Sequence, residues 1–199
     1  MELNVIIEKI SRHVPDANTG RGDHDLNPDM GVAAELTPAA VLVPLVLRDD
    51  GITVLFTQRT THLEHHPGQV SFPGGHVDPG DRTPDDTALR ETEEEVGLDR
   101  RHIEIIGHLD VYRTRTGFSV TPVVGLVTPP FEIDPDTHEV EEVFEAPLPF
   151  LLNTRNHERH TREIRGVERE FYAMPYNGHY IWGATAGMLV NLCDILTGN

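Results

Sequence analysis

Apolar residues occur along the chain either at helical spacing or in short unbroken runs, and each pattern predicts a type of element. Residues 3–13 place apolar side chains at helical spacing, which predicts a short amphipathic helix: Leu3, Ile6, Ile7 and Ile10. Two apolar, β-branched runs follow at 39–47 and 52–59, and the residues RDDG between them favour a turn. We expect these two runs to pair as a β-hairpin.

The stretch 84–96 carries the strongest helix signals in the sequence. Thr83 can cap its first turn, Pro84 suits the first helical position, and Gly97 can end the helix. Two aspartates in the first turn favour the positive end of the helix dipole. The sequence therefore predicts a helix here, and the second half of that helix, RETEEEV, is strongly acidic.

The rest of the chain mixes strand signals with one more helix. Strands are predicted at 103–112, 119–127, 169–176 and 179–183, the last two joined by an Asn-Gly turn, and an apolar helix at 183–198. Residues 15–30 show no period, so we expect an irregular connection, and the pattern leaves open whether it forms a lid. This mixture favours the α+β or α/β class, and the length favours a single domain over 1–199.

Composition narrows the classes of partner. The 199 residues include 16 Lys and Arg against 33 Asp and Glu, a formal net charge of −17, which opposes broad binding to nucleic acid or anionic membranes. No apolar run approaches the about 20 residues that cross a bilayer, and the first residues lack signal-peptide features. We therefore expect a cytoplasmic protein. Trp182 and the single cysteine, Cys193, are expected in the core.

The acidic half of the predicted helix places several carboxylates side by side. Glu91, Glu94 and Glu95 fall within about 100° of one face, whereas Glu93 points to the far side. Like charges four residues apart cost a helix about 0.2–0.5 kcal/mol per pair, and a bound divalent cation would reverse that cost. The adjacent FPGGH adds glycines whose backbone can approach a ligand closely. The pattern favours a hard-metal site over a solvated acidic surface, with a phosphate-bearing substrate.

These residues resemble the Nudix box, G-x5-E-x7-R-E-U-x-E-E-x-G-U with U apolar. Its second half is matched by Arg90, Glu91, Glu94, Glu95, Gly97 and Leu98, with Thr92 at an apolar position. In the first half, the residue six positions after Gly75 is Asp81 rather than Glu, and the loop before Arg90 is one residue longer.

The longer loop and the residues before it resemble the coenzyme A pyrophosphatase branch of the Nudix family. Within LFTQRTTHLEHHPGQVSFPGG, the matching positions are Leu55, Thr57, Arg59, Gly68, Phe72, Pro73, Gly74 and Gly75. Glu64 stands where the branch has arginine, and Thr60 where it has Ser or Ala. The resemblance leaves residues 1–38 uncovered. It implies an α+β fold of the α/β/α sandwich type, with the Nudix helix and a C-terminal helix packed on a mixed sheet.

The acidic pattern and the resemblance together suggest roles for individual residues. We expect Glu91, Glu94 and Glu95 to bind Mg²⁺ or Mn²⁺, with the carbonyl of Gly75 or Gly74 completing the shell. Arg90 would orient a glutamate through a charge-assisted hydrogen bond.

The general base and the phosphate ligands are less closely defined by the sequence. Glu139 is the candidate base, with Glu141 and Glu142 as rivals. Guanidinium groups pair well with phosphate oxygens, so the candidate substrate-binding residues are Arg59, Arg113 and Arg115, together with Gly74. Surface ion pairs are the alternative role of the three arginines.

The leading hypothesis is a Nudix pyrophosphohydrolase that splits coenzyme A or acyl-CoA into 3′,5′-ADP and the 4′-phosphopantetheine portion. A second hypothesis keeps this chemistry for a nucleotide sugar, a dinucleotide or a nucleoside triphosphate, an alternative that Glu64 keeps open. A third is a non-catalytic nucleotide-binding module. The sequence leaves the acyl chain, the number of metals, and the choice between monomer and homodimer open.

Overall fold

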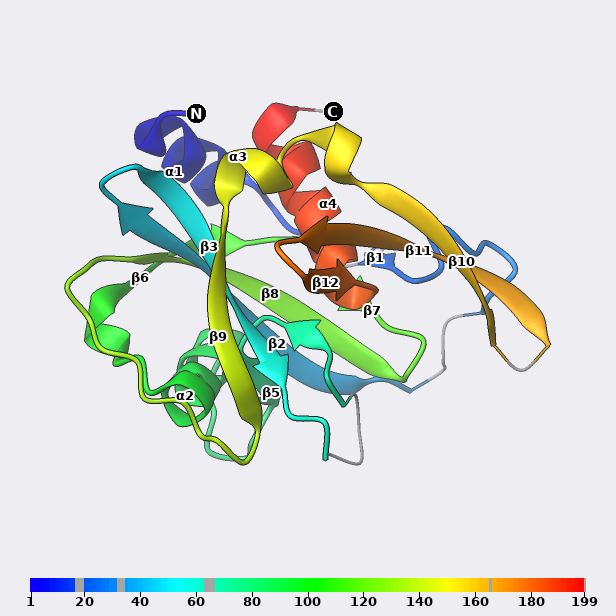
Figure 1. The fold of residues 1–199 in the computed structure, drawn as a ribbon, viewed down its shortest axis with the longest axis horizontal. Helices are drawn as coiled ribbons and strands as arrows, with labels where there is room; N and C mark the ends of the chain where they lie inside the picture. Colours follow the sequence, from blue (N-terminus) through cyan, green and yellow to red (C-terminus); the bar gives the residue numbers. More distant parts are fainter. Residues whose placement is uncertain (17–19, 32–34, 63–66, 165, 199) are drawn as a thin grey trace.

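The computed structural model describes residues 1–16, 20–31, 35–62, 67–164 and 166–198 (Figure 1). The helices are α1 (Leu3–Arg12), α2 (Pro84–Val96), α3 (Leu148–Leu151) and α4 (Ala184–Thr197). The strands are β1 (Arg21–Gly22), β2 (Thr37–Arg48), β3 (Gly51–Arg59), β4 (Val70–Ser71), β5 (Gly74–His76), β6 (Ile103–His108), β7 (Tyr112–Arg113), β8 (Phe118–Val127), β9 (Val140–Pro147), β10 (Glu158–Ile164), β11 (Val167–Tyr176) and β12 (His179–Trp182).

The larger sheet is mixed and has β2 at its centre. Strand β2 pairs with β8 in parallel and with β3 and β5 antiparallel, while β6 and β7 extend the sheet beyond β8, and β4 and β9 pair with β3. Strand β1 pairs in parallel with β7. Short β5 therefore lies against the middle of the sheet, where its two glycines face Ala40 and Val41.

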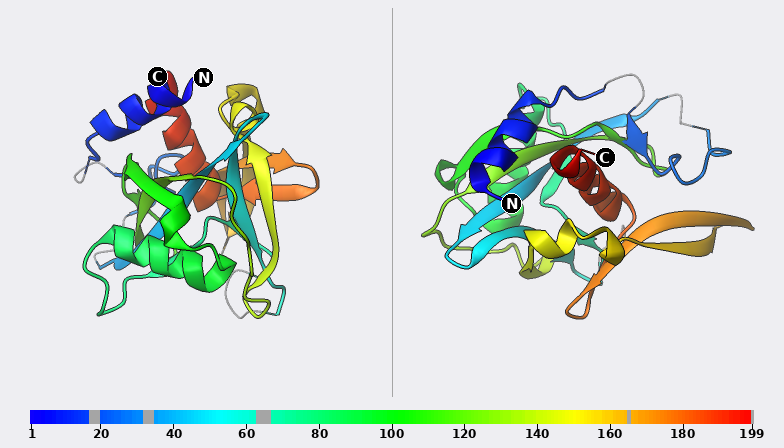
Figure 2. Two further views of the ribbon diagram at one scale, coloured as in Figure 1. Left: turned by 90° about the vertical axis from the view of Figure 1, so that its left-hand side faces the viewer. Right: turned by 90° about the horizontal axis from the view of Figure 1, so that it is seen from above.

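Alternate residues of β2 pack on opposite faces of this sheet. Leu42 and Val46 pack with the apolar side of α2, whereas Val43 and Leu45 join the core formed with α1 and α4. The strand buries both faces because helices cover both, which explains its nearly unbroken apolar run. Figure 2 shows α2 on one side and α1 and α4 on the other. The result is the α+β sandwich expected from the sequence.

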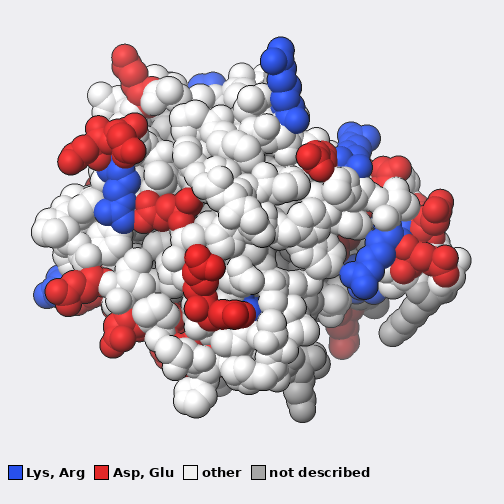
Figure 3. Space-filling view, in the orientation of Figure 1, with Lys and Arg blue, Asp and Glu red and all other residues white. Residues whose placement is uncertain are grey.

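A second, three-stranded antiparallel sheet, β10-β11-β12, leans away from the first (Figure 1). Its β11–β12 turn has Asn177 and Gly178 both at positive φ, 47° and 89°, as the Asn-Gly signal predicts. Acidic and basic side chains alternate on the projecting β10–β11 end, whereas acidic ones dominate over α2 and β9 (Figure 3). Among the described residues, no helix is long and apolar enough to cross a membrane.

Most predicted elements are confirmed. The N-terminal helix, the first hairpin, the acidic helix, the β11–β12 hairpin and the closing helix are present. The sequence analysis missed β9 and β10, whose polar surface residues hide any strand pattern. The run 103–112 is divided into β6 and β7 rather than one strand. Cys193 is buried as expected, but Trp182 is only partly buried and lines a cavity.

Candidate active site

Helix α2 is fixed at both ends and along its apolar side. The Thr83 hydroxyl accepts the Asp86 N–H at 3.2 Å, which caps the first turn. Gly97 ends the helix in the left-handed region at φ 70°, where a β-carbon would collide with the backbone of Asp134. Ala88 packs against the sheet. The acidic edge of the helix, formed by Glu91, Glu94 and Glu95, is therefore carried by a rigid element.

Glu95 is the most deeply buried member of this edge, with 6% of its surface exposed. Its carboxylate accepts the Gly74 N–H at 3.2 Å and an Arg59 N–H at 3.4 Å. Burial raises the pKa of Glu95 to about 8, although these two donors act in the opposite direction. Ionised Glu95 is thus short of positive charge, which a cation would supply.

Glu91 lies directly against strand β5. A β-carbon at Gly75 would overlap the Glu91 carboxylate, so only glycine allows this approach. Burial raises the pKa of Glu91, and the hydrogen bond from Arg90 partly opposes that rise. The glycines after Pro73 therefore allow the pairing with β2, and Gly75 also allows the close approach of the Glu91 carboxylate.

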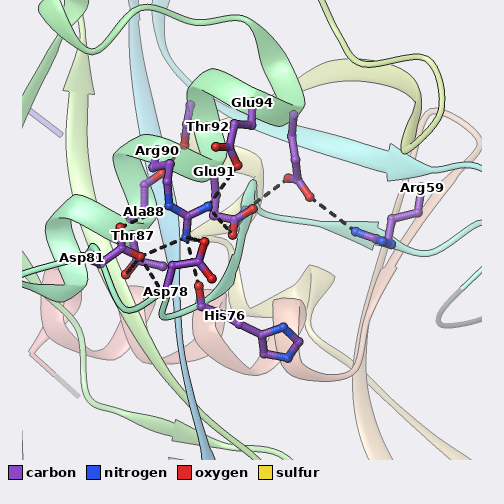
Figure 4. Close-up of polar contacts among 12 residues, drawn as sticks. Arg59, His76, Asp78, Asp81, Thr87, Ala88, Arg90, Glu91, Thr92 and Glu94 are labelled. Carbon is purple, nitrogen blue, oxygen red and sulfur yellow. Dashed lines mark hydrogen bonds and ion pairs between the residues drawn. The ribbon is translucent and has the colours of Figure 1, made fainter.

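Arg90 joins the helix, the glycine strand and the following loop (Figure 4). One of its terminal nitrogens donates to both Glu91 and Glu94 at 2.9 Å, and the other donates to the His76 carbonyl at 3.1 Å. Asp81 takes the remaining side of the guanidinium through two bonds, at 3.1 and 2.9 Å. Arg90 thus makes hydrogen bonds to two of the three predicted glutamates.

Asp81 completes the part of the motif that does not fit by spacing. Besides Arg90, its carboxylate accepts the Thr87 hydroxyl at 2.8 Å and the Asp78 N–H at 2.9 Å. The hydrogen bonds from Arg90 are the largest cause that holds the Asp81 pKa well below its usual range. An aspartate on a longer loop therefore reaches Arg90 from the strand side of the helix, a role that counting residues did not reveal.

Arg59 links the acidic edge to the candidate base. It lies at the end of β3, 3.4 Å from Glu95 and 3.6 Å from Glu139. Of the rivals to Glu139, Glu142 lies on β9 and is 3.8 Å from His179. The structure thus brings Arg59 and Glu139 to the acidic edge. It places Arg59 between carboxylates.

The far side of α2 is separate from this edge. Glu93 bonds to Arg100 at 2.8 Å, which confirms that it points away from Glu91 and Glu94. Thr92, at an apolar position of the motif, is buried, and its hydroxyl donates to the Ala88 carbonyl at 2.6 Å. Its polar group is satisfied within the helix, so a threonine is tolerated there.

The carboxylates are not gathered around one point. Within the described ranges, no group of three His, Cys, Asp or Glu side chains is arranged closely enough to hold a metal ion as it stands. Glu94, with 61% of its side chain exposed, is held by Arg90, while Glu95 is held by Arg59 and Gly74. These side chains would have to move for a shared cation.

A cavity of about 800 Å³ adjoins this edge at β5. Gly74, Gly75 and His76 form part of its wall, and most of its exposed lining is apolar. Arg115 lines the cavity, but Arg113, on β7, is not among its lining residues and lies beside Gly20. The two arginines that the sequence treats alike are therefore in different surroundings.

The NUDIX domain profile matches residues 36–176, which covers the sheet, α2 and the glycine strand. The chain belongs to the Nudix hydrolase family. It is thus a hydrolase of a diphosphate linkage, and Nudix enzymes generally use divalent metals such as Mg²⁺ or Mn²⁺.

Relatives support this assignment over most of the chain. A protein of Enterobacter sp. (strain 638), named as an uncharacterized Nudix hydrolase NudL, is 41% identical over 77% of this chain and 80% of its own length. A NudL of Photorhabdus laumondii is 38% identical over 78% of this chain and 83% of its own length. The Nudix domain of Shewanella oneidensis NrtR, solved with ADP ribose, has a TM-score of 0.50 at 19% identity, over 83% of this chain and 88% of that one, which supports the fold alone.

Two parts of the Nudix site were beyond the sequence analysis. The pairing of Asp81 with Arg90 had one signal, an acidic residue at the end of the longer loop. The cavity had no local signal, because its walls come from segments far apart in the chain. Glu64, the position that departs from the coenzyme A branch, lies outside the described residues.

Proposed function

We propose that this Nudix hydrolase cleaves the diphosphate of coenzyme A or acyl-CoA, giving 3′,5′-ADP and 4′-phosphopantetheine or its acyl form. The observation that carries the proposal is the position of the cavity. It shares β5 with the acidic edge, so a substrate whose diphosphate lies at Gly74 and Gly75 has an apolar space beside it for a long arm.

The residues of the acidic edge fit a divalent cation by their chemistry. Carboxylate oxygens and a glycine carbonyl are hard ligands of the kind that Mg²⁺ and Mn²⁺ prefer. The raised pKa of buried Glu95 marks a carboxylate whose ionised form lacks a nearby full charge other than Arg59. Glu91, Glu94 and Glu95, with Gly75 or Gly74, would hold the metal, and when bound it would neutralise phosphate charge and activate water.

Side chains of the protein have the remaining roles, which are positioning, proton transfer and phosphate binding. Arg90 keeps Glu91 and Glu94 in place, and Asp81 keeps Arg90 in place. Glu139 accepts a proton from the attacking water as its oxygen bonds to phosphorus, and the phosphorus–oxygen bond of the anhydride breaks. Each product keeps one phosphate of the cleaved anhydride, and 3′,5′-ADP also carries the 3′-phosphate of coenzyme A. Arg59 and Arg115 are the guanidinium groups best placed to bind phosphate oxygens.

The choice of Glu139 as base rests on its position. It is half-buried, it lies in the turn directly before β9, and it shares Arg59 with buried Glu95. Its rivals Glu141 and Glu142 lie on β9, and Glu142 is directed toward His179. A base at the rim of the metal site can reach a water on the solvent side of the phosphorus atom.

The test is a substrate panel with Mg²⁺ and with chelator, read by the masses of the products. Coenzyme A, octanoyl-CoA, ADP-ribose, a dinucleotide and a nucleoside triphosphate are compared at equal concentration. We expect 3′,5′-ADP from the first two with Mg²⁺ and none with chelator. Preferred cleavage of another diphosphate would replace the substrate, and binding of all compounds without products would remove the catalytic role.

A further inference from the structure

The cavity beside β5 has a wall that the Nudix domain profile does not cover. Its floor comes from β2, β5 and β8, and its far side from the three-stranded sheet and the start of α4. One further part of the wall is the segment Asp23–Met30, which lines the cavity through Asp23, Asn27 and Met30 and precedes the matched region 36–176. Residues 67, 69–72 and 114–116 complete the lining. Figure 1 shows this N-terminal segment in blue beside β1, β10 and β11.

Asn27 holds this segment onto the three-stranded sheet. It is 6% exposed, and its amide nitrogen donates to the carbonyls of Asp23 at 2.7 Å and Glu170 at 3.0 Å. Its amide oxygen accepts the Glu170 N–H at 3.0 Å. One side chain thus closes a local turn and pairs with strand β11, which lies 143 residues away in the sequence.

Further contacts fix the two ends of the segment. At one end, Asp23 accepts the Tyr112 hydroxyl at 2.8 Å and the Arg115 N–H at 2.7 Å. At the other end, Arg169 of β11 donates to both carboxylate oxygens of Asp29 at 2.9 Å. The segment is therefore built into the molecule, as a wall rather than a loose connection.

We propose that the segment Asp23–Met30, positioned by Asn27, determines which apolar group of the substrate this cavity accepts, and that the group is a flexible aliphatic chain. This inference rests on the proposed function. Asn27 acts as a positioning residue, because its three hydrogen bonds are made to backbone groups of the protein.

The lining favours an aliphatic chain over a purine ring. Met30 and Met188, the most adaptable apolar side chains, line the cavity with Phe118 and Trp182. A purine needs hydrogen-bond partners at its edge, and Asn27 already donates both amide N–H groups to backbone carbonyls and accepts the Glu170 N–H. Burying each methylene of a chain favours binding about fourfold, so a medium-length chain gains substantial affinity here.

The single tryptophan provides a readout that needs neither metal nor turnover. Trp182 lines the cavity, so a chain that enters it changes the environment of the only indole in the protein. We would titrate the whole protein in EDTA with S-octanoyl-pantetheine, which has no diphosphate, and with pantetheine alone. We expect a saturable shift of tryptophan emission with the acyl compound and a much weaker response with pantetheine.

Variants then connect the wall to substrate choice. Asn27→Ala should weaken S-octanoyl-pantetheine binding about tenfold, the equivalent of roughly two methylene contacts. It should lower the preference for octanoyl-CoA over coenzyme A, measured as the ratio of KM values, by a similar factor. Asp29→Asn breaks only the exposed pair with Arg169 and should act in the same direction by about twofold.

The matched control is Asn156→Ala. Asn156 also donates a side-chain hydrogen bond to a backbone carbonyl, that of Phe150, but it does not line the cavity. It should leave both the emission titration and the KM ratio unchanged. If Asn27→Ala fails to fold, the Asp29→Asn result decides alone.

The outcomes separate this inference from the proposed function. An unchanged Trp182 emission, or equal losses for coenzyme A and octanoyl-CoA in the Asn27 and Asp29 variants, would overturn the wall as a specificity device even if coenzyme A is cleaved. Chain-dependent binding that these variants weaken would support it even if the product masses show another diphosphate as the substrate.

Discussion

Strand β5 borders two environments that differ in almost every property. Toward α2, Gly75 lies against a carboxylate, and Arg90 directs its hydrogen bonds to three acidic side chains and a carbonyl. Toward the cavity, the lining is mostly apolar, and one of its polar residues, Asn27, bonds to the chain's own backbone. One strand thus separates groups suited to phosphate chemistry from groups suited to substrate selection. Substitutions on the two sides should affect different kinetic constants.

The largest effect is expected on the acidic side, from Glu94→Gln. The change keeps size and removes a charge that we assign to the metal, and the exposed side chain contributes little to the fold. Turnover with Mg²⁺ should fall more than about a hundredfold, because even groups behind metal ligands are worth about 10- to 100-fold. The measurement is kcat on the best substrate of the panel, with thermal unfolding to confirm an intact fold.

Glu93→Gln is the matched control for that change. It removes the same charge from the same helix, but on the far side, where Glu93 pairs with Arg100. Turnover should be nearly unchanged, and the lost surface pair should cost at most about 1 kcal/mol of stability. Equal losses in the two variants would show that helix charge matters and that the acidic edge has no special role.

The second effect concerns pH and the metal-free protein. The pKa of Glu95 is raised from its ordinary value of 4.5 to about 8, so the folded state binds a proton that the unfolded state has lost. This contribution is complete below about pH 4.5 and disappears as the pH rises toward 8. The free energy of unfolding in EDTA should therefore fall by a few kcal/mol across this window relative to Glu95→Gln.

Denaturant unfolding at a series of pH values checks this difference. Carboxylates with lowered pKa values, such as Asp81 and Glu145, act mostly below this window and cancel in the comparison with the variant. Added Mg²⁺ should flatten the decline, because it favours the ionised form. Identical pH profiles for the two proteins would contradict the burial argument for Glu95.

The sequence predicted the acidic side better than the cavity, for a physical reason. The cap at Thr83, the stop at Gly97 and the shared face of three glutamates depend on residues within one helix. By contrast, Asn27 meets Glu170 only after the chain has built two sheets, and β9 and β10 expose charged residues that mask strand periodicity. Local chemistry was predictable, and contacts between distant segments were not.

A third prediction tests the support behind the acidic side. Asp81→Asn removes the charge that Arg90 meets through two hydrogen bonds, so Arg90 should hold Glu91 and Glu94 less firmly. We expect a loss of about 10- to 100-fold in kcat or in Mg²⁺ affinity. Asp78→Asn is the control, because Asp78 is 3.9 Å from Arg90 with 63% of its side chain exposed. Equal behaviour of the two variants would remove Asp81 from the site.

The smallest effect is expected at the junction between the two sides of β5. It should distinguish two arginines that the sequence analysis proposes equally as phosphate ligands. Arg115 lines the cavity next to β5, whereas Arg113 lies beside Gly20, off the cavity lining. Arg115→Gln should raise KM about threefold with little change in kcat, and the difference should shrink at high salt because an exposed charge pair is screened. Arg113→Gln should leave KM unchanged at both salt concentrations. A larger KM effect at Arg113 would mean that the diphosphate is bound away from β5. This result would contradict the separation of phosphate chemistry and substrate selection on the two sides of the strand.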